Sequence, residues 1–284
     1  MKNVFVFIFA LLFCYHTLAE DPFIFRSLSK SVNDMTVVDS GHVRVWYALN
    51  ALDIQKPETY DDLQRLEIGT HISKYFSHYV FTSDSLITDW KNKNRNAQSA
   101  PSWMGEKGKN SNWSEYYYSE YFKDFEKNTF TEYSRMPWGF ITNYQYTESM
   151  PAQIWELKND TLTVAGFLCQ KATCTFRGRS YTAWFAQDIP IPNGPWKLGG
   201  LPGLILKAYD ADKLYQFECI RIENREEKYP IKKYDYSRYK ETGQKELLKL
   251  QKEIHEDYLK VAAIIPLGEN KPRPKIKYNP LELE

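Results

Sequence analysis

The sequence predicts a mainly β protein, in which one antiparallel meander forms an open curved sheet or half-barrel with a short N-terminal helix and a C-terminal amphipathic helix packed on it. Three observations predict this class. The chain holds 21 Tyr, 16 Phe and 8 Trp, and aromatic residues favour the half-buried surface of a pleated sheet. Short runs of alternating apolar and polar residues are bounded by turn residues. The connections between these runs are short, which favours antiparallel neighbours.

Residues 1–19 have the pattern of a secretory signal peptide, with one lysine, an apolar stretch and small residues up to Ala19. The apolar stretch is shorter than the ~20 residues of a membrane-spanning helix. Phe13, which precedes Cys14, is too large for a lipid-attachment site. We therefore expect residues 20–284 to form a single β-rich domain in the periplasm or cell envelope, soluble rather than lipid-anchored, with no transmembrane segment.

The numbers of acidic and basic residues bear on which classes of partner the protein is expected to bind. Removal of Lys2 with the signal peptide leaves 36 acidic residues matched by an equal number of basic ones. Nucleic-acid binding needs a basic surface, so no nucleic-acid partner is expected. His71 and His78 share a face only if their segment is helical, and the local pattern is extended. Neither a metal site nor a cofactor is therefore expected.

The first half of the chain contains strands, one short helix and a polar segment. The segment HVRVWYALN alternates as a strand, and the segment that begins at Asp61 alternates until its period is lost near Tyr75. We interpret the latter as a strand followed by an irregular edge. Capping residues at the start of SDSLITDWKNK, from Ser83, predict a short helix. Residues 93–114 are polar with scattered Gly and Pro, which indicates a flexible insertion.

The second half contains dense strand signals and one helix. The alternating runs after Phe140 include GFITNYQYT, QIWELK, LTVAGFLCQKATCTF, SYTAWFAQ, GLILKAYD and KLYQFECIRIE. Asn159-Asp160 and Arg177-Gly178 suit hairpin turns. Near the end, apolar residues recur at helical spacing, which predicts an amphipathic helix over one side or end of the sheet. The predicted apolar face of that helix consists of Leu247, Leu250, Ile254 and Tyr258.

Three cysteines remain after signal cleavage: Cys169, Cys174 and Cys219. An odd number in an oxidising compartment allows one disulfide and one leftover thiol. On a continuous strand Cys169 and Cys174 point to opposite faces, so they should not bond to each other. Cys174 and Cys219 both fall on apolar faces. Two interpretations stay open, a Cys174–Cys219 disulfide and two ordinary buried thiols.

The stretch GGLPGLIL, residues 199–206, combines three glycines and a proline with apolar residues. A phosphate-binding loop would precede a helix and supply Lys, Ser or Thr, whereas LILKAYD has the pattern of a strand. Pro202-Gly203 fits the two central positions of a type II turn, where glycine takes a positive φ. The motif therefore predicts a tight corner that leads into a buried strand.

The region from Ala165 to Asp210 resembles the core motif of the GLPGLI family, which is named for the residues at 200–205. The segments YNPLELE and LEIGTHISKYFSHY also resemble family patterns, so the resemblance covers nearly all of the mature chain. It implies an exported envelope protein of a kind found beside TonB-dependent outer-membrane transport systems. The matching residues are Trp155, Cys169, Lys171, Ala172, Arg177, Gly178, Arg179, Tyr181, Trp184, Asp188-Ile189-Pro190, Gly194-Pro195 and Gly200–Ile205.

A candidate binding patch lies around the predicted hairpin tip. Arg177 and Arg179 flank a glycine there and are suited to bind a carboxylate of a ligand or partner, although a solvated hairpin has the same pattern. Trp184 suits either the floor of an apolar pocket or the core. Asp188 has the position of a turn-forming residue or, as the alternative, of a catalytic acid. The expected exposed patch consists of Arg177, Arg179, Trp184, Asp188, Leu201 and Pro202.

Three functions are compatible with these features. The first is a non-enzymatic envelope binding protein that docks onto an outer-membrane protein. The second is a carrier of a lipid or other apolar molecule in a half-barrel cavity. The third is an enzyme, a hydrolase that uses Asp188 or a thiol-redox enzyme that uses an exposed, reactive Cys169. The sequence has no Gly-x-Ser-x-Gly motif, and no histidine lies next to a cysteine, so it favours the first two.

Overall fold

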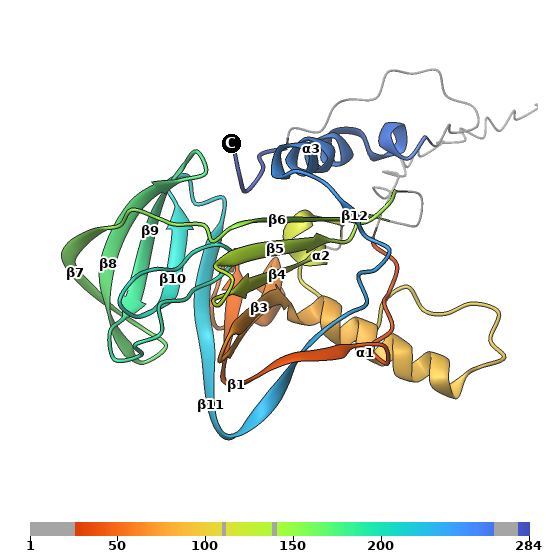
Figure 1. Cartoon of the computed structure of the whole chain (residues 1–284), viewed down its shortest axis with the longest axis horizontal. Helices are drawn as coiled ribbons and strands as arrows, with labels where there is room; N and C mark the ends of the chain where they lie inside the picture. Colours follow the sequence, from red (N-terminus) through yellow and green to blue (C-terminus); the bar gives the residue numbers. More distant parts are fainter. Residues whose placement is uncertain (1–25, 110–111, 138–140, 264–277) are drawn as a thin grey trace, which may run out of the picture.

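The computed structural model describes residues 26–109, 112–137, 141–263 and 278–284. In this part of the chain one open sheet and three α-helices form the fold, which confirms the predicted mainly β class (Figure 1). None of the described helices is both long and apolar enough to cross a membrane. The predicted signal peptide, residues 1–19, lies outside the described residues.

The sheet contains 12 strands in the order β12-β6-β5-β4-β3-β2-β1-β11-β10-β9-β8-β7. Neighbouring strands are antiparallel, except for the parallel pair β12 and β6. The strands are β1 (Thr36–Leu49), β2 (Asp62–Gly69), β3 (Ile72–Ser77), β4 (Ser119–Asp124), β5 (Thr129–Ser134), β6 (Tyr144–Ser149), β7 (Glu156–Val164), β8 (Phe167–Phe176), β9 (Arg179–Ala186), β10 (Leu204–Asp210), β11 (Gln216–Lys233) and β12 (Lys240–Glu241). The helices are α1 (His78–Lys93), α2 (Glu115–Tyr118) and α3 (Gln244–Val261), with a 3₁₀ turn η1 at Pro57–Thr59.

The long strands β1 and β11 pair in the middle of the sheet and join its two halves. Strands β2 to β6 lie on one side of this pair and β7 to β10 on the other, as Figure 1 shows. The pairing of β1 with β11 is interrupted between Gly41 and Val43, which face Tyr229 and Asn224. A bulge in β11 absorbs the difference, and such bulges bend a strand.

Helix α1 begins at His78, five residues before the predicted start at Ser83. The hydroxyl of Ser77 accepts a hydrogen bond from the backbone N–H of Val80 at 3.1 Å. Ser77 is therefore the N-cap, a role for which serine is strongly favoured. The loss of strand period near Tyr75 marks the approach to this helix, and the irregular edge predicted there is wrong.

Helix α3 packs through one face, in line with the predicted amphipathic helix. Leu247, Ile254 and Tyr258 are buried as expected, whereas Leu250 is only partly buried. Its place in the buried row is taken by Gln251, whose amide donates hydrogen bonds of 3.2 Å to Glu132 Oε1 and Ser134 Oγ on β5. A glutamine is tolerated in this position because its polar group is satisfied.

One of the two predicted hairpin turns is confirmed. Arg177 and Gly178 connect β8 to β9 with φ of 50° and 74°, as a type I′ turn requires. Asn159-Asp160 instead lies inside β7, where the pairing with β8 shifts. The turn between β7 and β8 forms at Ala165 and Gly166, with φ of 49° and 84°, since Gly166 takes the positive φ without strain.

The corner in GGLPGLIL differs in detail from the prediction. The glycine with positive φ is Gly200, at 77°, and not Gly203, so the predicted type II turn at Pro202-Gly203 is wrong. Gly203 is needed for another reason, because a Cβ there would lie 2.2 Å from the carbonyl oxygen of Ala186. The buried strand that follows is confirmed, since β10 starts at Leu204 with its first three residues fully buried.

The polar segment at residues 93–114 contacts the rest of the domain. Lys109 N donates a hydrogen bond of 2.8 Å to Tyr60 O, and Met104 N donates one of 3.1 Å to Ser83 Oγ. A Cβ at Gly108 would lie 1.7 Å from the carbonyl oxygen of Asp61. The segment therefore runs close to the beginning of β2.

Candidate functional site

A mainly apolar groove of about 400 Å³ lies beside the C-terminal end of β2 and the part of β1 that pairs with it. Its opposite wall is the start of the loop from β9 to β10, within the region in which the sequence predicted a binding patch. The volume falls in the range of small-molecule sites. The lining residues are Ser40, Gly41, His42, Val43, Ile68, Gly69, Thr70, Phe125, Pro190, Ile191, Pro192 and Asn193.

Two glycines allow the chain to pack closely at this groove. A Cβ at Gly41 would lie 2.0 Å from the carbonyl oxygen of Ile68, and one at Gly69 would lie 2.3 Å from Asp39 Oδ2. The same Asp39 oxygen accepts a backbone hydrogen bond of 2.8 Å from Ile72 and thereby ties down the β2–β3 turn. The close approach therefore requires glycine at both positions.

The opposite wall is held by a buried lysine. Lys123 Nζ on β4 donates hydrogen bonds to Asn193 Oδ1 at 2.8 Å, Leu198 O at 2.6 Å and Gly194 O at 3.4 Å. All three acceptors are neutral, and burial lowers the pKa of Lys123 to about 7. A lysine has three donors, so this ammonium is fully satisfied and fixes the loop from β9 to β10 in place.

The lowered pKa of Lys123 makes a prediction about stability. Between about pH 8 and pH 10 the folded chain binds fewer protons at Lys123 than the unfolded chain does, so raising the pH favours folding. We expect the free energy of unfolding of the wild type, relative to Lys123→Met, to rise by about 1 kcal/mol per pH unit in this window. Urea unfolding of both proteins across the window measures this difference. A difference that does not change with pH would contradict the assigned titration.

Arg179 is not part of an exposed patch, so that part of the sequence prediction is wrong. Its side chain is 3% exposed and pairs with Asp210 Oδ2 at 3.0 Å. It also donates hydrogen bonds to Asn279 Oδ1 at 2.6 Å and to the carbonyl oxygens of Pro280 and Leu281. The guanidinium does bind a carboxylate and carbonyl groups, but they belong to the chain's own strand β10 and C-terminal segment.

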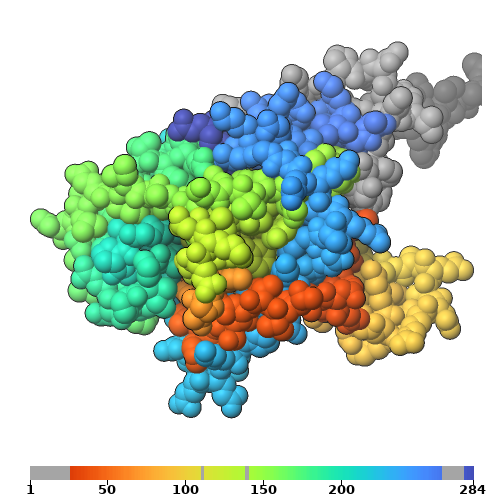
Figure 2. Space-filling view, viewed as in Figure 1, coloured from red at the N-terminus to blue at the C-terminus, as the bar shows by residue number. Residues whose placement is uncertain are grey.

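Arg177 also contacts the C-terminal segment. It pairs with Glu148 and with Glu282, the latter at 3.4 Å. The buried Lys197 binds the same two carboxylates, at 3.0 Å and 2.6 Å. Figure 2 shows the C-terminal residues, in the darkest blue, on the surface between α3 and the half of the sheet that contains β8 and β9. Arg177, Arg179 and Lys197 thus all bind residues of the C-terminal segment.

The other predicted patch residues are dispersed. Trp184 is half-buried on β9, with Lys171 Nζ 5.8 Å from its ring centre. Asp188 and Pro202 are exposed, whereas Leu201 is buried in the core. The structure therefore does not gather the six predicted residues into one surface.

The cysteines are free and buried in the described structure, so the Cys174–Cys219 disulfide is not formed. Strands β9 and β10 separate Cys174 on β8 from Cys219 on β11, a lateral distance of about 14 Å. A disulfide needs Cα atoms within about 7 Å. Burial raises the pKa of Cys169 to about 11, so this thiol lacks the exposed thiolate that thiol-redox catalysis requires.

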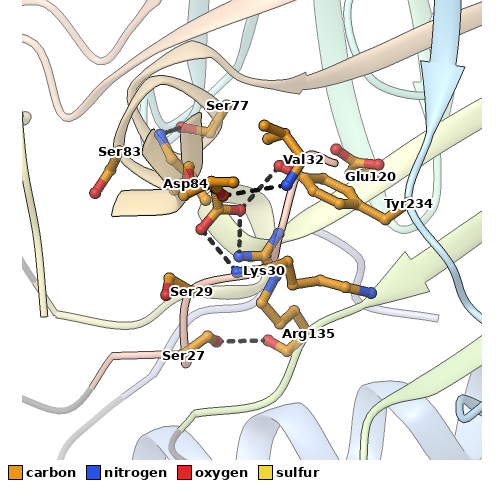
Figure 3. Close-up of polar contacts among 12 residues, drawn as sticks. Ser27, Ser29, Lys30, Val32, Ser77, Ser83, Asp84, Glu120, Arg135 and Tyr234 are labelled. Carbon is orange, nitrogen blue, oxygen red and sulfur yellow. Dashed lines mark hydrogen bonds and ion pairs between the residues drawn. The ribbon is translucent and has the colours of Figure 1, made fainter. Parts of the chain in front are cut away.

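A second buried charge network joins the N-terminal residues to α1 (Figure 3). Asp84 Oδ2 accepts hydrogen bonds from Arg135 Nη1 at 2.8 Å and Tyr234 OH at 2.9 Å. Its other oxygen accepts one from the backbone N–H of Lys30 at 3.0 Å. The Lys30 ammonium lies 4.5 Å from the ring centre of Tyr239, and burial lowers its pKa to about 8. We interpret this network as an anchor for the segment that precedes β1.

No group of three or more His, Cys, Asp or Glu within the described ranges could hold a metal ion. His71 pairs with Glu126 at 2.8 Å, and His78 packs edge-on against Trp46. The two histidines therefore have separate surroundings.

Sequence reasoning missed the groove and Lys123. The available signals were weak: a lysine among aromatic residues in YFKDF, and two glycines, one just before a predicted strand and one inside the next. Neither signal indicates that Asn193 and Lys123 meet, since 70 residues separate them.

The fold defines this chain as a mainly β domain with one open sheet. A family model described as "N-glycanase peptide, N-terminal domain" matches residues 84–245, which is more than half of the chain, and the chain belongs to this family. The comparison with curated proteins finds no match. The resemblance to the GLPGLI family stays a prediction from the sequence.

Two solved structures are similar at a low level. The structure of PNGF-II in space group P21 is 12% identical with a TM-score of 0.45, and the match covers 76% of this chain and 34% of that chain. The structure of PNGF-II in space group C2 is 13% identical with a TM-score of 0.43, and the match covers 83% of this chain and 36% of that chain. The match thus spans little more than a third of each PNGF-II chain.

Proposed function

We propose that this chain is a non-enzymatic binding protein of the cell envelope that holds apolar side chains of a protein partner in the groove beside β1 and β2. The observation that carries this proposal is the groove itself, an apolar hollow of ligand-binding size whose wall is held by the Lys123 ammonium.

The proposed partner is an outer-membrane protein, and association with TonB-dependent transport follows from the resemblance to the GLPGLI family. Export by the signal peptide would place the chain in the same compartment. The finer shape of the fold, a meander curved into a half-barrel, belongs to this proposal. The contact between Lys123 on β4 and the loop before β10 supports it, since β3, β2, β1 and β11 lie between those strands in the sheet.

A carrier of a lipid or another apolar molecule is the second candidate, because the same groove has the volume of a small-molecule site. Site-specific photo-crosslinking separates the two. A photoreactive phenylalanine analogue at Phe125, which is 43% exposed in the groove, is expected to crosslink to a polypeptide in intact cells. Mass spectrometry of the adduct then tests whether the polypeptide is an outer-membrane protein. A lipid-sized adduct would favour the carrier, and no adduct beyond that of a control at Leu52 would contradict both.

A charge placed in the groove tests the same proposal by substitution. Ile191→Asp introduces a carboxylate onto an apolar wall, and we expect the crosslink yield at position 125 to fall about tenfold. The control is Ile154→Asp, at a side chain that is 92% exposed and lies outside the groove. Equal yields in the two variants would show that the groove does not contact the partner.

A further inference from the structure

A second groove, of about 270 Å³, differs from the first because its lining is cationic. It lies over β1, β2 and β3 and is bordered by the C-terminal end of β11. The lining residues are Met35, Arg44, Arg65, Glu67, Lys74, Phe76, Phe81, Pro230 and Lys232. Four of these side chains are basic and one is acidic.

The strand register explains why these charges gather. Arg44 on β1 faces Glu67 on β2, and Glu67 faces Lys74 on β3. Arg65 lies two residues from Glu67 on the same strand, so its side chain shares that face of the sheet. Four charged side chains therefore form one cluster on three adjacent strands.

The single carboxylate does not balance this cluster. Glu67 Oε1 is shared by two guanidinium groups, Arg44 Nε and Arg65 Nη2, each at 3.2 Å. Lys232 makes no ion pair with any carboxylate in the described part of the chain. The Nε of Arg65 is buried and finds no acceptor among the described residues. A buried donor without a hydrogen-bond partner lowers the stability of the fold, so a bound acceptor at this position would be stabilising.

Lys74 contributes less, because Glu120 pairs with it at 2.9 Å. The charges of the two arginines also affect a neighbouring histidine. Burial and the neighbouring guanidinium groups, Arg65 first among them, lower the pKa of His78 to about 4. The four basic side chains of the groove therefore outnumber by two the carboxylates that pair with them, Glu67 and Glu120.

Aromatic rings hold the two guanidinium groups in place. The Arg44 guanidinium carbon lies 3.7 Å from the ring centre of Tyr229, and that of Arg65 lies 4.7 Å from the ring centre of Phe76. Stacked guanidinium groups lose little entropy when they bind an anion and can present paired donors to a phosphate. The apolar side chains of Met35 and Phe81 line the same groove.

We propose that this cationic groove binds a small phosphate ester, with the phosphate group between Arg44, Arg65 and Lys232 and an apolar substituent against Met35 and Phe81. The basic side chains of the groove suit the phosphate group of such a molecule, and the apolar side chains suit its substituent. This site is separate from the apolar groove and does not rest on the function proposed above.

Phenyl phosphate is the probe that tests this proposal. We expect saturable binding by NMR titration at millimolar concentration, with shift changes at residues of β1, β2 and β3, tighter than for inorganic phosphate and absent for phenol. Lys232→Gln removes an exposed lysine and should weaken binding about tenfold, since the phosphate loses one charged hydrogen-bond donor. Arg65→Met should abolish binding in a variant whose amide spectrum remains dispersed.

The matched control is Lys228→Gln, an exposed lysine on the same strand outside the groove, which should bind like the wild type. No saturable binding, or equal weakening by the two lysine variants, would overturn the proposal. Flotation with phosphatidylglycerol vesicles tests whether the phosphate group belongs to a lipid headgroup or to a soluble ester. If the wild type floats with the vesicles and Lys232→Gln does not, the ligand is a lipid headgroup. If the wild type does not float, the ligand is a soluble ester. Ile191→Asp should leave phenyl phosphate binding unchanged, so the two proposals can fail independently.

Discussion

Replacing Arg179 with methionine is expected to lower the free energy of unfolding by about 3–5 kcal/mol, because it leaves Asp210 as a buried carboxylate without its counter-ion. The Arg179 and Asp210 side chains are 3% and 2% exposed, so water cannot replace the lost partner. The substitution also removes the donor to Leu281 O and releases the C-terminal segment. Chemical denaturation followed by tryptophan fluorescence measures the loss.

Two variants show whether the loss comes from the ion pair. Arg221→Met, at a side chain that is 61% exposed, should change stability by less than about 1 kcal/mol. Adding Asp210→Asn to Arg179→Met should recover part of the stability, since the Oδ1 that accepts the backbone hydrogen bond of Tyr215 can remain. If Arg179→Met folds as stably as the wild type but loses a partner, Arg179 has the binding role that the sequence suggested.

Replacing Asp84 with asparagine is expected to lower the free energy of unfolding by about 3–5 kcal/mol and to loosen the segment before β1. The substitution removes the charge that Arg135 pairs with, and both side chains are almost fully buried, at 3% and 6% exposed. The hydrogen bond from Lys30 N, drawn in Figure 3, would also weaken. Hydrogen exchange at residues 26–35, together with denaturation, reports both effects.

The control for Asp84 lies on the same helix. Asp89 is 59% exposed and pairs with Lys93 at 2.7 Å, so Asp89→Asn should change stability by less than about 0.5 kcal/mol. A loss in Asp89→Asn as large as in Asp84→Asn would mean that α1 responds to charge in general. A loss confined to Asp84→Asn, without faster exchange at residues 26–35, would remove the anchoring role.

Much of the secondary structure followed from local patterns. The alternation in HVRVWYALN predicted the second half of β1, and LILKAYD coincides with β10. The spacing of Leu247, Ile254 and Tyr258 predicted α3. These predictions hold because the sheet and the helix each bury one face, and a buried face leaves a period in the sequence.

The misplaced elements depended on single backbone contacts. The start of α1 is set by the Ser77 cap, and the β7–β8 turn by the positive φ that Gly166 allows. In GGLPGLIL the proximity of Ala186 O to Gly203 decided which glycine serves close packing and which takes a positive φ. Sequence alone offers several residues for each of these roles, and only the assembled backbone selects one.

Arg179, next to the β8–β9 turn, was predicted to lie in an exposed patch, but the structure buries it. A charged residue beside a turn is usually exposed, and it is buried only when a partner compensates for the lost hydration. The partners of Arg179 are Asp210 and residues about a hundred positions away at 279–281. No local pattern could report that pairing.

The sequence by itself determined the mainly β class, the position of α3 and the buried strand β10, since these depend on the alternation of apolar and polar residues along the chain. The tertiary structure alone decided which polar residues became internal partners and where the grooves lie. Lys123 meets Asn193 only in the folded sheet, and Arg44 meets Glu67 only after β1 and β2 are paired in register. Both grooves bring together residues that are distant in sequence, the cationic groove mainly across paired strands and the apolar groove between paired strands and the loop before β10.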